Sequence, residues 1–63
     1  MYKDLIKEIS QPLTPGRYYK LLLDNAEVIL IQVAQTSKAQ VAKDLGMTPQ
    51  VFATAIKFIA SNV

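Results

Sequence analysis

The clearest hydrophobic pattern in the chain lies in its second half, where apolar residues recur at helical spacing in two runs. The first run gives a short helix one apolar stripe, formed by Val41, Ala42 and Leu45. Ser37 followed by Gln40 is a capping-box pattern at its start. Gly46 predicts its end, because glycine adopts the left-handed backbone conformation without steric cost.

A second helix is predicted to follow after a short turn. Thr48 suits the cap position and Pro49 the first helical position. The apolar stripe then continues to about Ser61 through Phe52, Ala55, Ile56 and Ile59. Two helices joined by a short turn built on glycine form a helix-turn-helix. The predicted motif covers about 37–61, and its second helix, the recognition helix, covers about 49–60.

The first half of the chain predicts helices less clearly. Apolar residues at helical spacing predict an amphipathic helix over about 2–10: Tyr2, Leu5, Ile6 and Ile9. The segment 11–16 holds two prolines and indicates a connector, in which Thr14 can cap a helix that begins at Pro15.

The pattern over 18–34 fits two structures. A helical stripe runs through it, but several residues are β-branched and Asp24-Asn25 could turn a hairpin. We favour helix, because a helix-turn-helix needs an upstream helix to bury its inner face. Asp24 with Glu27 matches a capping box and predicts a break, with one helix ending near Leu23 and another starting at about Asn25. The predicted fold is an all-α, small helix-turn-helix domain of three to four short helices, with residues 1–63 forming one domain.

Composition sets limits on size and partners. A chain of 63 residues has room for a single core. It is 51% hydrophobic and has no cysteine, so we expect a cytoplasmic protein stabilised by packed apolar surface. The apolar surplus predicts a homodimer whose interface lies on residues 18–33. Charged and polar residues interrupt every apolar stretch, so we expect no membrane span.

Basic charge is concentrated in the second half. Acidic and basic side chains balance over residues 1–35, whereas residues 36–63 contain three lysines and one aspartate. This distribution is typical of a chain whose second half faces phosphates, although three lysines also fit an ordinary solvated surface.

The second half also carries a family resemblance. The run from Ala42 to Gly46, with Ala55 and Ile56 further on, resembles phage repressors and Cro-type regulators at the same spacing. The resemblance is confined to the motif at residues 38–57. It implies a DNA-binding protein that represses or regulates transcription, with double-stranded DNA as partner.

The resemblance also implies which residues contact DNA. The solvent-facing positions of the second helix and its cap would read bases: Thr48, Pro49, Gln50, Ala53, Thr54 and Lys57. The start and outer face of the first helix suit phosphate contacts that set register, and the residues there are Thr36, Ser37, Lys38, Gln40 and Lys43.

The sequence gives little support for an enzyme. The chain has no histidine or cysteine, its glycines stand alone, and its carboxylates are dispersed. We therefore expect no catalytic activity, metal, cofactor or small-molecule substrate. The alternative function is a protein-interaction module or inhibitor that uses an apolar helix-turn-helix surface. Exposure of Val51, Phe58 and Ile59 as a patch would favour that alternative.

Overall fold

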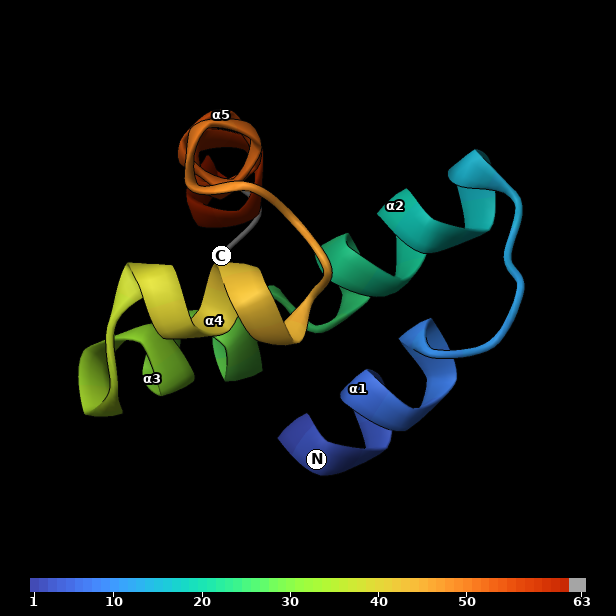
Figure 1. Ribbon diagram of the computed structural model, residues 1–63, viewed down its shortest axis with the longest axis horizontal. Helices are drawn as coiled ribbons and strands as arrows, with labels where there is room; N and C mark the ends of the chain where they lie inside the picture. Colours follow the sequence, from blue (N-terminus) through green and yellow to red (C-terminus); the bar gives the residue numbers. More distant parts are fainter. Residues whose placement is uncertain (62–63) are drawn as a thin grey trace.

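The computed structural model describes residues 1–61, which form five α-helices and no strand (Figure 1). The helices are α1 (Tyr2–Ile9), α2 (Pro15–Asp24), α3 (Ala26–Gln35), α4 (Lys38–Asp44) and α5 (Pro49–Ser61). The all-α class is confirmed. The expected three to four helices are corrected to five, because the segments before and after the expected break near Asn25 both form complete helices, α2 and α3.

The break between α2 and α3 falls at Asn25, whose backbone leaves the helical region at φ −110° and ψ 23°. Its side-chain amide donates to the Leu21 carbonyl oxygen over 2.8 Å. The expected capping box is absent, because Asp24 is the last residue of α2 and pairs with Lys20, Nζ to Oδ2 3.6 Å. The break is where the sequence placed it, but it is stabilised by a different residue.

Side chains cap the starts of α2, α4 and α5 as predicted. The hydroxyl of Thr14 accepts from the backbone N–H of Arg17, and that of Thr48 from the N–H of Val51, at 3.3 and 3.2 Å. Ser37 accepts from the Gln40 backbone N–H at 3.1 Å. The reciprocal half of that capping box does not form, because the Gln40 side chain donates to Asp44 instead.

The core is built from all five helices. α3 and α4 lie beneath α5, which is seen end-on in Figure 1, and α1 and α2 lie together beside them. The hairpin alternative for residues 18–34 is wrong, since that stretch buries one helical stripe in the core. The fully buried side chains include Leu22, Ile29, Val41, Leu45, Phe52 and Ile59.

The turn from α4 to α5 closes with two backbone hydrogen bonds. The Gly46 N–H donates to the Lys43 carbonyl and the Met47 N–H to the Ala42 carbonyl, at 3.1 and 2.8 Å. This pair is a Schellman motif, which requires a left-handed residue directly after the cap. Gly46 supplies it with φ +74°, and no other described residue has a positive φ.

A Gly46→Val substitution tests this turn. A Cβ at Gly46 meets nothing within 4 Å, so the whole penalty comes from the backbone. We expect valine to lower the free energy of unfolding by about 1–3 kcal/mol in urea denaturation. Gly46→Asn is the matched control and should lose less, because asparagine adopts positive φ more readily. An equal free energy of unfolding for the valine variant and the parent would contradict the requirement for a positive φ at Gly46.

Candidate nucleic-acid interface

α4 and α5 pack closely because the residue between them is small. Ala42 is only 1% exposed and lies in the core with Val41 and Leu45 from α4 and Phe52 from α5. Met47, in the turn, packs against this cluster and is half-buried. The apolar stripes that the sequence predicted for the two helices therefore meet in one core.

The outer face of α5 carries the residues predicted to read bases. Gln50, Thr54 and Lys57 are exposed and lie about one turn apart, so their side chains line up along the helix. Ala53 and Pro49 are exposed beside them. The α5 side of the predicted site is therefore one continuous surface.

Two hydroxyls on this surface also bond to the backbone. Thr48 is exposed and serves as the cap of α5, which engages its oxygen as an acceptor and leaves its O–H free to donate. The Thr54 hydroxyl donates to the Gln50 carbonyl over 3.5 Å, which is a long and therefore weak contact. The sequence predicted the Thr48 cap but not the bond from Thr54 to Gln50.

On the α4 side of the predicted site, some side chains are bonded within the protein and others are available to a ligand. Ser37, Lys38, Gln40 and Lys43 are all exposed, as is the preceding Thr36. The Ser37 hydroxyl caps α4, the Gln40 amide donates to Asp44, and the Thr36 hydroxyl donates to the Gln32 carbonyl. Lys38 and Lys43 form no ion pair within residues 1–61, so their ammonium groups are available to an anion.

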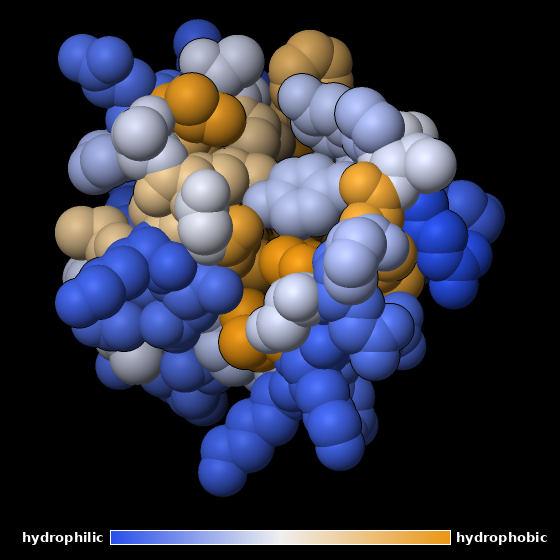
Figure 2. Space-filling view, turned by 45° about the vertical axis from the view of Figure 1, so that its right-hand side comes forward, coloured by the Kyte–Doolittle hydropathy of each residue, from blue (hydrophilic) through white to orange (hydrophobic). Residues whose placement is uncertain are grey.

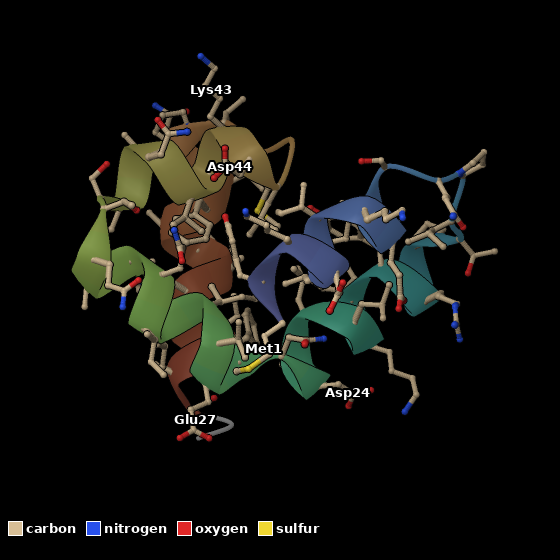
Figure 3. The ribbon with its side chains drawn as sticks, turned by 90° about the horizontal axis from the view of Figure 1, so that it is seen from below. Met1, Asp24, Glu27, Lys43 and Asp44 are labelled. Carbon is tan, nitrogen blue, oxygen red and sulfur yellow. The ribbon has the colours of Figure 1, made fainter. Side chains whose placement is uncertain are left out.

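Lys43 lies at the opposite end of the molecule from the acidic residues Asp24 and Glu27 (Figure 3). Lys43 extends outward from α4, whereas Asp24 and Glu27 lie at the far end of α2 and the start of α3 (Figure 3). Asp44, the acidic residue nearest to Lys43 in sequence, accepts from Tyr2 Oη at 3.0 Å and from Gln40 Nε2 at 2.9 Å. Its oxygens are thus held by neighbours within the protein.

Two tyrosine hydroxyls connect the N-terminal helices to α4. Tyr2 of α1 donates to Asp44, and Tyr18 of α2 donates to the Leu45 carbonyl oxygen at the end of α4, over 2.7 Å. Burial and the Asp44 carboxylate raise the pKa of Tyr2, and burial raises the pKa of Tyr18. Both hydroxyls are therefore protonated at neutral pH and can donate these bonds.

The two adjacent tyrosines of α2 differ in burial. Tyr18 packs against the core, while Tyr19 is 58% exposed and meets the Tyr18 ring edge to face, with ring centroids 6.2 Å apart. The sequence contains no signal for the Tyr18 hydrogen bond, because its partner lies 27 residues away.

A groove runs along one side of α5. Its cavity volume is about 700 Å³, and it lies between α5 and the segment from the end of α1 into α2. Val51 and Phe58 line it and are exposed, whereas Ile59 is buried at 1%. Two of the three residues expected to discriminate between DNA binding and protein binding therefore form an exposed patch beside the predicted DNA-reading face.

No protein-family model, curated protein or solved structure matches this chain. Within residues 1–61, no helix is long and apolar enough to span a bilayer. The same residues hold no group of three or more His, Cys, Asp or Glu side chains placed to bind a metal ion.

The Tyr18 hydrogen bond has a matched test in the adjacent residue. Tyr18→Phe leaves the Leu45 carbonyl without this donor and should lower the free energy of unfolding by about 1 kcal/mol. Tyr19→Phe removes an exposed hydroxyl and should change it by less than about 0.5 kcal/mol. Urea denaturation of both variants measures the difference. Equal losses would show that the Tyr18 bond does not hold α2 to α4.

Proposed function

We propose that this protein binds double-stranded DNA sequence-specifically, as a small transcriptional regulator of the repressor or Cro type, and inserts α5 into the major groove. The observation that carries the proposal is the exposed row of Gln50, Thr54 and Lys57 on a helix set by a glycine turn against α4. An α-helix with polar side chains on its outer face fits the width of the major groove. α4, the turn and α5 would then act as a helix-turn-helix.

The side chains of α5 that are proposed to contact DNA suit different chemical groups of the duplex. The Gln50 amide can pair bidentately with adenine, and Lys57 can reach a phosphate or a guanine. Ala53 and the Thr54 methyl can contact a thymine methyl group. Thr48 and Pro49 place the start of α5 beside the DNA, where the free O–H of Thr48 can donate to a phosphate.

Phosphate contacts from α4 would set the register of α5 in the groove. Lys38 and Lys43 are exposed and unpaired within the described chain, so they are the strongest candidates. Ser37 and Gln40 are weaker candidates than the sequence implied, because each already has a partner in the protein. The proposal requires neither a cofactor nor a catalytic step.

Binding by a single copy should be weak. The net charge is only +2 and α5 carries one lysine and no arginine, so few phosphates are neutralised. Two copies on half-sites about 34 Å apart would compensate, as in other helix-turn-helix dimers. In a bacterial or phage-infected cell, such a regulator would act in the cytoplasm.

A second candidate function is supported by the groove beside α5. Exposed Val51 and Phe58 form the kind of apolar patch that binds another protein, as in an inhibitor or adaptor. This candidate leaves unexplained the polar row on the outer face of α5 and the unpaired lysines of α4. We therefore favour DNA binding.

Salt dependence tests the proposal with a charge-matched pair of variants. On a duplex selected from a random pool, the slope of log affinity against log salt should be about −3 to −6 for a dimer. Lys57→Gln should reduce the magnitude of this slope by about 1 for each bound copy. Lys7→Gln removes the same charge from the exposed side of α1 and should leave the slope unchanged.

Two results would overturn the proposal. One is a failure to retain any duplex from the pool at low salt. The other is an equal change of slope in the Lys57 and Lys7 variants, which would make the binding a general effect of net charge.

A further inference from the structure

The groove beside α5 collects exposed apolar side chains. Five large hydrophobic side chains are exposed in residues 1–61, and three of them, Tyr19, Val51 and Phe58, line this groove. The other two, Met1 and Ile31, lie outside it. Figure 2 shows a face on which apolar side chains gather in the centre, surrounded by hydrophilic ones. The exposed apolar surface is therefore concentrated at one place.

We propose that a second copy of the chain occupies this groove in a twofold dimer, with Phe58 of each copy seated in the hollow of the other. A twofold interface uses the same patch on both subunits, so the patch must contain both a projection and a hollow. Phe58 is 64% exposed and lines a hollow of about 700 Å³. One patch thus supplies both parts.

The charge of the groove favours a second copy over a nucleic acid or a charged peptide. No described residue that lines it is Asp, Glu, Lys or Arg. Two copies with a net charge of +2 each can meet there without burying a charge, which would be costly without a partner. A phosphate backbone or an acidic peptide would find no cation in the groove.

The groove side of α5 differs from its predicted DNA-facing side. Val51 and Phe58 are seven positions apart and share one side of the helix, as do Gln50 and Lys57. Successive residues are about 100° apart around an α-helix, so these two sides are turned from each other by about that angle. Dimer contact and DNA contact can therefore occur together, with Thr48 and Thr54 at their border.

This interface differs from the one expected from sequence. Residues 18–33 were expected to carry the dimer contact, but Leu22, Ala26 and Ile29 are buried in the core of a single copy. Among residues 18–33, Tyr18 and Tyr19 line the groove. The idea that this dimer sets the spacing of two DNA half-sites rests on the proposed function. The dimer itself can be measured without DNA.

Sedimentation equilibrium of the full chain without DNA, from about 1 to 500 µM, tests this dimer. We expect the parent to associate in this range. Phe58→Lys should lower the association constant by about a hundredfold, because a twofold interface contains the substitution twice. Ile31→Lys adds the same charge at an exposed position outside the groove and should lower it less than threefold.

Val51→Lys is a second groove variant and should also weaken the dimer by at least about tenfold. Circular dichroism confirms that each variant is folded, which is expected because all three positions are exposed. A parent that stays monomeric up to 500 µM would overturn the inference. An association constant lowered as much by Ile31→Lys as by the groove variants would also overturn it.

Discussion

The arrangement of α4 and α5 depends on two small residues, and the rest of the molecule is built around that arrangement. Ala42 lets the two helices approach, and Gly46 provides the positive φ that the Schellman turn between them requires. Because Phe52 and Ile59 of α5 then enter the core, the opposite side of α5 faces solvent. A single backbone constraint therefore determines both what is buried and which side chains are available to a ligand.

The N-terminal helices complete the core and hold α4 in place. Leu5, Leu22 and Ile29 close the apolar interior from α1, α2 and α3, which a two-helix motif could not bury alone. The hydroxyls of Tyr2 and Tyr18 reach the end of α4 directly. Their bonds hold the end of α4 against α1 and α2, so contacts from the N-terminal helices help to position the face proposed to bind DNA.

Local signals in the sequence predicted the second half well. Ser37, Gly46 and Thr48 act within a few residues of themselves, so their capping and turn roles follow from spacing alone. Long-range partners could not be read in the same way. Tyr18 bonds 27 residues away, and Phe58 shares its groove with residues of α2. One local choice was also missed, because Asp24 pairs with Lys20 four residues before it rather than capping α3. The candidate DNA-reading face was therefore predictable, but the groove beside it was not.

The most direct measurement of the proposed DNA contact is an NMR titration of the ¹⁵N-labelled chain with a selected duplex at low salt. We expect the amide shifts to change along residues 37–43 and 48–57, while those of α1 stay where they are. Shifts that leave Gln50, Lys57 and residues 37–43 unchanged, or that change equally over α1 and α5, would contradict the proposal that α5 reads DNA.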